Sequence, residues 1–411
     1  MRRIVIVGAS LSGLRTAQAL RAEGFDGTLT LVGAEHHLPY DRPPLSKGAL
    51  LGTSTPQDLF LPGGTELGAE WILGQPATAL DLSQRCVHIG DETSVGFDGL
   101  VIACGLKARR PGFARYMAGV FHVRELSHSA ELATRLQPGH RLVIVGAGFI
   151  GCEVAAAARQ LGVDVTVVHR GTQPLQSVLG GEVGALCATM HKEHGVKFVP
   201  NTCVDALKGK DYVTGVKTSD GTVIPADTVV VSTGAQPATQ WLAGSGLDVE
   251  DGVLCDCRLR AAGADSVVAV GDVVRWPNGV FDGEKMRVEH WTQAAESAVA
   301  AARSLLHGET ASPYLTVPSL WSDQYDTKIQ SVGLPRLGAE QRVVVGSLNS
   351  GSFVVAYLRR DRLMGAVAFN RPKPLAALRM AIMRLEPLPR SFGSYGAAAG
   401  ATDVPTTARA R

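Results

Sequence analysis

The sequence lacks the features that mark membrane, secreted and nucleic-acid-binding proteins. No apolar run reaches the length that spans a bilayer, so no transmembrane helix is expected. A strand-like run begins almost at the first residue and leaves no room for a signal peptide, so we expect a cytoplasmic protein. The net charge is only +2 at pH 7, which argues against general nucleic-acid binding.

Cysteine is also scarce in this chain. The 7 cysteines are an odd number at irregular spacing, which indicates no disulfide framework. Cys255 and Cys257 form a C-x-C pair. We expect both to be ordinary residues of a strand rather than a metal or redox site. No cysteine precedes Cys86, so the chain before it offers no thiol for redox chemistry.

What the sequence does contain is a strand–turn–helix–strand pattern at its start. The β-branched run 4–7 is typical of a strand buried on both faces, and Gly8, Ser10 and Gly13 follow it. A second apolar strand precedes Glu35, 22 residues beyond Gly13. This is the dinucleotide-binding fingerprint: amides at a helix N-terminus hold a pyrophosphate, and the acid binds a ribose. Ser10 replaces the usual second glycine but is small enough for a pyrophosphate to approach.

The same pattern occurs again between residues 141 and 170. Gly146, Gly148 and Gly151 stand between an apolar strand and a helix, and Gly234 lies in the turn that closes this unit. Two such units imply two bound dinucleotides. A flavin and a nicotinamide are the natural combination, because hydride passes from one to the other.

We therefore predict an α/β fold with two Rossmann-like dinucleotide-binding domains, for FAD and NAD(P), and a small α+β C-terminal domain. A chain of 411 residues is long for one core, which agrees with several domains. The expected boundaries are 1–112 and 241–317 for a discontinuous FAD-binding domain, 113–240 for the NAD(P)-binding domain, and 318–411 for the C-terminal domain, with a disordered tail from about 395.

A later strand delivers Gly271 and Asp272 at its carboxyl end. Ligands of parallel sheets bind at strand carboxyl ends, so Asp272 is a candidate to bind a sugar hydroxyl; the alternative is a cap of the next turn. Glu289, His290 and Trp291 open the following helix and are candidates for the same ligand, although a Trp at a helix start more often only packs.

The segment 36–52 contains two cations, Arg42 and Lys47, among prolines that stop any strand. A helix is expected to start near Leu45. Local pattern alone leaves two interpretations of the cations open. They either face the flavin, with Lys47 near the ring and Arg42 near the phosphates or ribityl chain, or they are surface charges.

At this point the chain resembles the FAD-dependent ferredoxin reductases of the putidaredoxin and rubredoxin reductase type. These are members of the pyridine nucleotide-disulfide oxidoreductase superfamily that have a glutathione-reductase-like fold but no redox disulfide. The resemblance covers about residues 2 to 390. It rests on VGASLSGLRTA, YDRPPLSKG, VGAGFIGCEVAA, the VGD at 270–272, VEHWTQA and PSLWSDQYDTKIQSVG.

The resemblance implies an NAD(P)H:ferredoxin oxidoreductase that serves a cytochrome P450 or an oxygenase through an iron–sulfur ferredoxin. It implies that FAD is held by the first unit together with Glu35, Arg42, Lys47 and Asp272. It also places Trp291 and Trp321 near the isoalloxazine and Glu153 near the nicotinamide. Lys47, Glu153 and Trp321 are then the expected catalytic residues. An acidic ferredoxin would need a basic docking patch, for which the candidates are Arg42, Arg371, Lys373 and Arg379.

The sequence departs from this family at two places. Cys104 stands where the family usually has threonine, beneath the cofactor. The acid expected after the second strand of the NAD(P) unit is replaced by His169 and Arg170. A guanidinium can pair with a 2′-phosphate, so we predict that NADPH is used at least as well as NADH. The alternative is that Arg170 points to solvent and both nucleotides are used.

Two other functions are compatible with the same fold. A disulfide- or peroxide-type reductase or NAD(P)H oxidase would carry a redox cysteine beside the flavin, but Lys47 occupies the place that such a thiol would need. A non-catalytic binding role like that of apoptosis-inducing factor is disfavoured by the absence of a targeting sequence and of a large basic surface signal.

Overall fold

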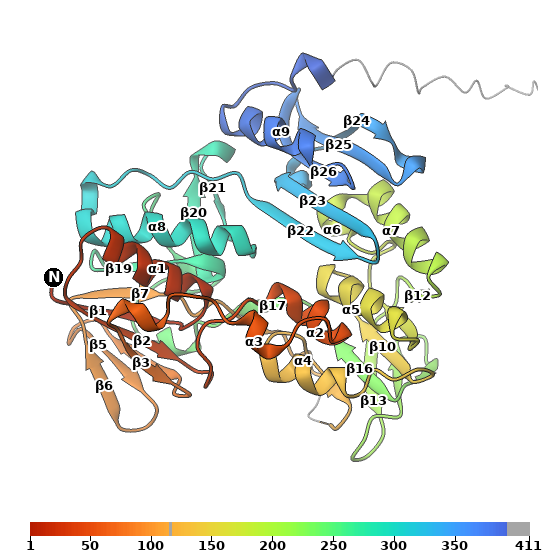
Figure 1. Cartoon of the computed structure of the whole chain (residues 1–411), viewed down its shortest axis with the longest axis horizontal. Helices are drawn as coiled ribbons and strands as arrows, with labels where there is room; N and C mark the ends of the chain where they lie inside the picture. Colours follow the sequence, from red (N-terminus) through yellow and green to blue (C-terminus); the bar gives the residue numbers. More distant parts are fainter. Residues whose placement is uncertain (115–116, 393–411) are drawn as a thin grey trace, which may run out of the picture.

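The structure, a computed structural model, describes residues 1–114 and 117–392 (Figure 1). The tail expected from about residue 395 lies outside the described residues. Among the described residues, no helix is long and apolar enough to cross a membrane.

The opening strand of the chain is the centre of a five-stranded parallel sheet with the order β19-β7-β1-β2-β3 (Figure 1). Its strands are β1 (Arg3–Val7), β2 (Thr28–Gly33), β3 (Glu70–Leu73), β7 (Gly99–Ile102) and β19 (Val267–Ala269). The β-branched residues of β1 are buried because layers cover both faces of the sheet. Helix α1 (Leu11–Ala22) packs against α8 (Trp291–His307) although the two are far apart in sequence. The carboxyl ends of these strands share one edge, which is where the predicted first unit places its ligand.

A second five-stranded parallel sheet has the order β12-β11-β10-β16-β9. Its strands are β9 (Val120–Phe121), β10 (Arg141–Val145), β11 (Asp164–Val168), β12 (Lys197–Val199) and β16 (Thr228–Val231). The helices of this region are α4 (Leu126–Ala133), α5 (Phe149–Gln160), α6 (Gln176–Leu179) and α7 (Gly181–Glu193). A three-stranded antiparallel sheet of β13 (Val204–Lys208), β14 (Gly215–Thr218) and β15 (Val223–Pro225) is inserted between β12 and β16. The repeated sequence pattern thus folds into a repeated sheet architecture.

The two regions are joined by a short antiparallel ladder between β8 (Leu106–Ala108) and β17 (Ala235–Pro237). Each of these strands follows the small-residue turn that closes its own unit. The amide of Arg109 donates to the carbonyl of Gly234 at 3.0 Å, and the amide of Ala238 donates to that of Gly105 at the same distance. The ladder therefore holds the two closing turns side by side.

The C-terminal region is an antiparallel sheet with the order β22-β23-β26-β25-β24, packed on one helix (Figure 1). Its elements are β22 (Ser319–Gln324), β23 (Thr327–Gly333), β24 (Glu340–Ser347), β25 (Ser352–Arg359), β26 (Arg362–Phe369) and α9 (Lys373–Met383). One hydrophobic cluster joins Phe353 and Tyr357 of this sheet to Leu179 and Val183 of the second region. The small α+β unit that the sequence predicts is therefore present, and this cluster packs its sheet against the second region.

The remaining elements are short. They are α2 (Gly48–Leu51), α3 (Pro56–Leu59), β4 (Ala77–Asp81), β5 (Cys86–Ile89), β6 (Thr93–Gly96), β18 (Val253–Leu254), β20 (Val274–Asn278) and β21 (Glu284–Met286). The helix expected near Leu45 is divided: a 3₁₀ turn covers Pro43–Ser46, and α2 begins only at Gly48. Lys47 has a non-helical backbone between the two turns, which interrupts the helix at that residue.

Candidate functional site

The first glycine turn closes tightly on the backbone around it. Gly8 has φ +122°, and a Cβ atom there would lie 2.1 Å from the carbonyl oxygen of Ala103. A Cβ on Gly13 would lie 2.0 Å from the carbonyl oxygen of Gly8. Only glycine fits both places. Ser10 is the N-cap of α1, and its side chain makes no capping hydrogen bond, so the amides of the first turn keep their donors for a ligand.

The second glycine turn repeats this geometry. Gly146 has φ +110°, and its Cβ would lie 2.1 Å from the carbonyl oxygen of Ser232. A Cβ on Gly151 would lie 2.2 Å from the carbonyl oxygen of Gly146. At Gly148, in contrast, a Cβ would meet no described heavy atom within 4 Å. The outer glycines are thus required by packing, whereas the middle one leaves open space at a helix N-terminus, as a pyrophosphate requires.

Glu35, the acid of the first unit, is held by two side chains that follow it. Its carboxylate accepts a hydrogen bond from the hydroxyl of Tyr40 and pairs with the guanidinium of Arg42, each at 2.5 Å. Arg42 also donates to the backbone carbonyl of Arg124 at 2.5 Å. Burial acts to raise the pKa of Glu35, but the charge of Arg42 and these hydrogen bonds outweigh it and lower the pKa. The carboxylate is therefore ionised and fixed in place before any ligand arrives.

Asp272 lies at the end of the same sheet edge, as its sequence position predicts. One of its oxygens is 3.6 Å from a guanidinium nitrogen of Arg124, and the amide of Gly271 donates to the hydroxyl of Ser297 at 3.0 Å. Burial raises the pKa of Asp272, and Arg124 opposes this rise. Sequence reasoning missed Arg124, because only the fold brings the segment between the two units to this edge.

Lys47 and Glu153 come together although they belong to different regions. The ammonium nitrogen of Lys47 lies 2.7 Å from a carboxylate oxygen of Glu153, whose side chain is only 3% exposed. The hydroxyl of Ser46 donates to the same oxygen, and that of Ser322 donates to the other oxygen at 2.6 Å. A buried carboxylate is tolerated only when it is paired in this way. The sequence indicated both charged residues but neither serine.

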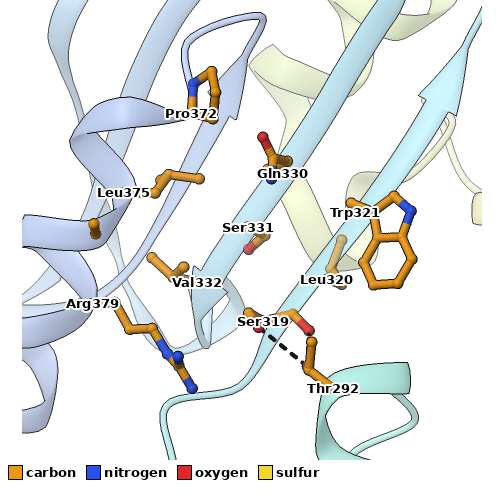
Figure 2. A pocket seen from close by; sticks show the side chains of 11 residues that line it. Thr292, Ser319, Leu320, Trp321, Gln330, Ser331, Val332, Pro372, Leu375 and Arg379 are labelled. Atoms are coloured by element: carbon orange, nitrogen blue, oxygen red, sulfur yellow. Dashed lines mark hydrogen bonds between the residues drawn. The ribbon is translucent and has the colours of Figure 1, made fainter.

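Two tryptophans meet beside this pair. Trp291 and Trp321 pack edge to face with their ring centroids 5.9 Å apart, and the indole nitrogen of Trp291 donates to Asp41 at 2.6 Å. A pocket of about 250 Å³ lies between β22, β23 and α9, and Trp321 and Arg379 are among the residues that line it (Figure 2). The two tryptophans that the resemblance indicates thus lie in contact with each other.

The other two residues at the start of α8 differ from each other. Glu289 pairs with Arg287 at 2.7 Å, so it already has a partner within the chain. The Nδ1 atom of His290 is buried and has no hydrogen-bond partner among the described residues. Burial lowers the pKa of His290 to about 4, which leaves a neutral ring at pH 7. An orphaned buried nitrogen here is the kind of group that a bound cofactor would satisfy.

His169 and Arg170 follow the second strand of the second unit. His169 is buried, packs edge-on against Phe198 with centroids 5.8 Å apart, and has an unpartnered Nε2 atom within the described structure. Burial lowers the pKa of His169, so the ring is neutral. Arg170 is exposed, and Gly234 has φ +94° beside Thr233, whose buried hydroxyl also has no described partner. The second unit therefore offers open polar groups where the first has a closed acid network.

The cysteines and the cations proposed for docking differ in their surroundings. All cysteines of the chain are free, and burial raises the pKa of Cys104 to about 11, which keeps it a thiol rather than a thiolate. Arg42 lies inside the Glu35 network with its side chain 24% exposed, so its membership of the docking patch stays a prediction. Arg371 and Lys373 are exposed, whereas Arg379 pairs with Glu296 at 2.9 Å.

The fold and its two glycine turns, at Gly8–Gly13 and Gly146–Gly151, are typical of enzymes that bind two dinucleotides on successive Rossmann-like sheets. The sequence profile of the pyridine nucleotide-disulphide oxidoreductase family matches residues 2–298, and the reductase C-terminal profile matches 319–392. The chain belongs to the pyridine nucleotide-disulphide oxidoreductase family. It is a flavin-dependent NAD(P)H oxidoreductase, and the family implies FAD and a nicotinamide nucleotide as cofactors.

The chain is similar over nearly its whole length to reductases of oxygenase systems. It is 35% identical to the ferredoxin–NAD(+) reductase subunit of the benzene 1,2-dioxygenase system of Pseudomonas putida, over 91% of this chain and 90% of that protein. It is 36% identical to rhodocoxin reductase of Rhodococcus erythropolis, over 94% of this chain and 90% of that one. Its structure matches the reductase in the covalent putidaredoxin reductase–putidaredoxin complex with a TM-score of 0.91 and 30% identity, covering 96% of each chain.

Proposed function

We propose that this protein is an FAD-dependent NAD(P)H:ferredoxin oxidoreductase. It takes a hydride from the nicotinamide nucleotide and passes single electrons to a [2Fe–2S] or similar ferredoxin that serves a cytochrome P450 or an oxygenase. The observation that carries the proposal is the pair of the partly buried Lys47 with the buried Glu153, which stands where a disulfide reductase needs a thiol. The names of the relatives reported above, which are reductases of dioxygenase, rhodocoxin and putidaredoxin systems, support the same partner class.

The residues of the first unit fit FAD. The glycine turn at Gly8 and Gly13 leaves backbone amides free at a helix N-terminus for the pyrophosphate. Glu35 is an ionised acceptor suited to the ribose hydroxyls, and Asp272 at the same sheet edge suits a hydroxyl of the ribityl chain. FAD, when bound, supplies the conversion between a two-electron donor and a one-electron acceptor.

Lys47 and Glu153 set the charge and geometry at the proposed site of hydride transfer. Lys47 carries a positive charge into a site that is largely closed to water, and Glu153 keeps that ammonium group fixed. Hydride transfer between stacked rings needs no acid–base catalyst, so the main task of these residues is to orient the reactants and set the charge around them. Trp321 and Trp291 add apolar surface that excludes water beside them.

The second unit supports NADPH as a substrate. No carboxylate stands after β11 to repel a 2′-phosphate, and the exposed Arg170 can pair with one in bidentate fashion. Several relatives are named for NAD(+), so the NADPH preference proposed here rests only on this chain's own departure at His169 and Arg170. We assign FAD to residues 1–112 and 241–317, NAD(P) to 113–240 and the C-terminal unit to 318–392. The cytoplasm, which supplies reduced nicotinamide nucleotides, is the proposed compartment.

The ferredoxin is proposed to approach the side of Trp321. Arg371 and Lys373 are exposed cations on the C-terminal unit and would attract an acidic iron–sulfur protein. This arrangement separates electron exit from the nicotinamide side, which lies at Glu153 in the second unit. A disulfide reductase is disfavoured because Cys104, on the first unit's closing turn, remains a protonated thiol. A purely binding role does not explain two intact glycine turns and the charge pair at Glu153.

A steady-state assay tests the proposal. The protein loaded with FAD is mixed with NADPH, a [2Fe–2S] ferredoxin and cytochrome c. We expect cytochrome c reduction to rise with ferredoxin concentration and to saturate, with no comparable turnover of glutathione disulfide or coenzyme A disulfide. Lys47→Ala should slow flavin reduction, and the exposed Lys107→Ala is its matched control. Rapid disulfide turnover that does not depend on ferredoxin would refute the proposal.

A further inference from the structure

A continuous chain of buried hydrogen bonds runs from Glu153 into the C-terminal sheet and back to the second unit. Ser322 donates to Glu153 at 2.6 Å, and the amide nitrogen of Gln324 lies 3.0 Å from the hydroxyl of Ser322. The amide oxygen of Gln324 lies 2.9 Å from Nε2 of His191, and Nδ1 of His191 lies 3.0 Å from the hydroxyl of Tyr325. The side chains of Ser322, Gln324 and His191 are fully buried.

The direction of every bond in this chain follows from the carboxylate at its end. An ionised Glu153 only accepts, so Ser322 must use its single proton on Glu153 and accept from Gln324. That choice leaves the Gln324 oxygen to accept the proton on His191 Nε2, and His191 Nδ1 then accepts from Tyr325. All donors therefore point toward Glu153, and bonds aligned in this way strengthen one another.

The turn that carries Tyr325 is built for this contact. Tyr325 has φ +56° at the tip of the β22–β23 hairpin, a conformation that favours glycine and is unusual for a bulky residue. Its ring stacks on His194 with centroids 3.6 Å apart and an interplanar angle of 11°, while its hydroxyl reaches His191. Such strain persists only where the surroundings hold it, and here the surroundings are the C-terminal end of α7.

Strand β22 therefore serves two sides of the site. Successive side chains of a strand point to opposite faces, so Trp321 faces away from Ser322 and Gln324. One face carries the tryptophan beside Trp291, and the other carries the hydrogen-bond chain to Glu153. A shift of this strand would move both.

We propose that His191, Gln324 and Tyr325 are positioning residues that orient Glu153, so that the C-terminal hairpin helps to set the hydride-accepting side of the site. This inference rests on the proposed function, because it assumes that hydride arrives beside Glu153. It assigns to the C-terminal unit a role besides electron exit. None of the three residues needs to touch a reactant.

The test compares Gln324→Met, which keeps the volume and removes the hydrogen bonds, with Asp323→Asn on the opposite face of β22, where Asp323 lies 3.6 Å from Lys328 at the surface. Flavin reduction by NADPH is followed by stopped flow without ferredoxin. Because small displacements of positioned groups slow reactions steeply, we expect Gln324→Met to lower the limiting rate about tenfold or more, and Asp323→Asn to change it less than about twofold. Reoxidation of the dithionite-reduced flavin by ferredoxin should stay near wild type in both variants.

Two further measurements separate positioning from loss of structure. Nitrogen NMR of histidine-labelled protein should show His191 neutral with its proton on Nε2 at pH 7, and Gln324→Met should alter this signal. Tyr325→Gly should relieve the strained turn, so that the melting temperature does not fall, and should still slow flavin reduction. Tyr325→Phe removes only the hydroxyl and therefore tests the hydrogen bond to His191 separately. Wild-type reduction rates in Gln324→Met and Tyr325→Gly would overturn the inference. If NADPH reduces the flavin of the wild-type protein but the reduced flavin does not pass electrons to ferredoxin, the proposed function fails. The positioning result would still stand.

Discussion

The two dinucleotide-binding units share a backbone and differ in their side chains. In both, the first glycine has a positive φ and packs against the carbonyl of a neighbouring strand's closing turn, and the last glycine packs on the first. The nearest atoms in these contacts are main-chain carbonyl oxygens, so the same glycines are required in both units. The units differ at the end of their second strands. Glu35 is bound there by neighbouring side chains, whereas Arg170 is exposed to solvent.

This difference shows how one fold can bind two different nucleotides. The first unit fixes its carboxylate through Tyr40 and Arg42, as suits a cofactor that stays bound. The second leaves the Nε2 atom of His169 and the hydroxyl of Thr233 without described partners, as suits a substrate that comes and goes. Preorganisation lowers the cost of binding, whereas open groups wait for the ligand to satisfy them.

The largest expected effect comes from breaking the shared backbone. Gly13→Ala places a Cβ atom 2.0 Å from a carbonyl oxygen, so we expect a loss of about 3 kcal/mol or more in the free energy of unfolding, together with loss of bound FAD. Gly148→Ala has open space and should leave stability within about 0.5 kcal/mol while weakening nucleotide binding. Melting temperature and FAD content per chain measure both. A Gly13→Ala protein that is stable and yellow would contradict the comparison.

Acid should lower stability through buried histidines such as His191 of the second region and His290 of the first. Burial lowers the pKa of His191, in the second region, to about 4 from an ordinary value of 6.5. As pH falls through this window, the unfolded chain binds the proton first, so stability is lost between pH 6.5 and 4, by at most about 3 kcal/mol. Glu35 has a lowered pKa, so its contribution is kept down to pH 4.5 and is lost only below that.

Chemical denaturation at pH 7, 6 and 5 tests this sign. The wild type should lose stability steadily over this range, and His191→Leu should show a flatter dependence, although it starts less stable. The exposed His88→Leu is the matched control and should follow the wild type. Equal slopes in all three proteins would show that His191 titrates normally.

A smaller effect is expected when the acid of the first unit is neutralised. Glu35→Gln keeps the shape but removes the charge that pairs with the partly buried Arg42 and accepts from Tyr40. Charge-assisted hydrogen bonds are worth about 1.5–3 kcal/mol, so FAD affinity should fall by about one to two decades. Fluorescence of FAD released on dilution gives the dissociation constant. No change in that constant would mean that Glu35 serves only to hold Arg42.

The smallest effect is selective for the nucleotide. Arg170→Ala should raise the Michaelis constant for NADPH by about tenfold and leave that for NADH within about twofold, because only the 2′-phosphate loses a partner. The same measurement on Arg135→Ala, a cation of the same region, provides the control. A wild-type enzyme that strongly prefers NADH would show that His169 and Arg170 do not recognise the phosphate.

Much of this site was predictable because its signals are local. The glycine turns, the buried strands and Glu35 follow from short-range patterns, and the strand-end position of Asp272 follows from the rule for parallel sheets. Lys47 and Glu153 were indicated by resemblance, but their 2.7 Å pairing depends on packing between segments far apart in sequence. Short-range patterns carry no information about such distances.

The missed residues share one property. Arg124, Ser322 and Gln324 act only through contacts made by the tertiary fold. Ser322 and Gln324 lie in the run PSLWSDQYDTKIQSVG, which supports the resemblance but assigns neither residue a role. The turn at Tyr325 runs against local rules, since a glycine would be expected there. Such conflicts between local preference and observed structure point to function more often than agreement does.

Double-mixing stopped flow tests the central claim most directly. The FAD-loaded protein is first reduced anaerobically with one equivalent of NADPH and then mixed with excess [2Fe–2S] ferredoxin. The account predicts full flavin reduction in the first step and two reduced ferredoxins per flavin in the second, with Arg170→Ala slowed only in the first step at low NADPH. A flavin that NADPH does not reduce, or one that gives its electrons to oxygen or disulfides but not to ferredoxin, would contradict it.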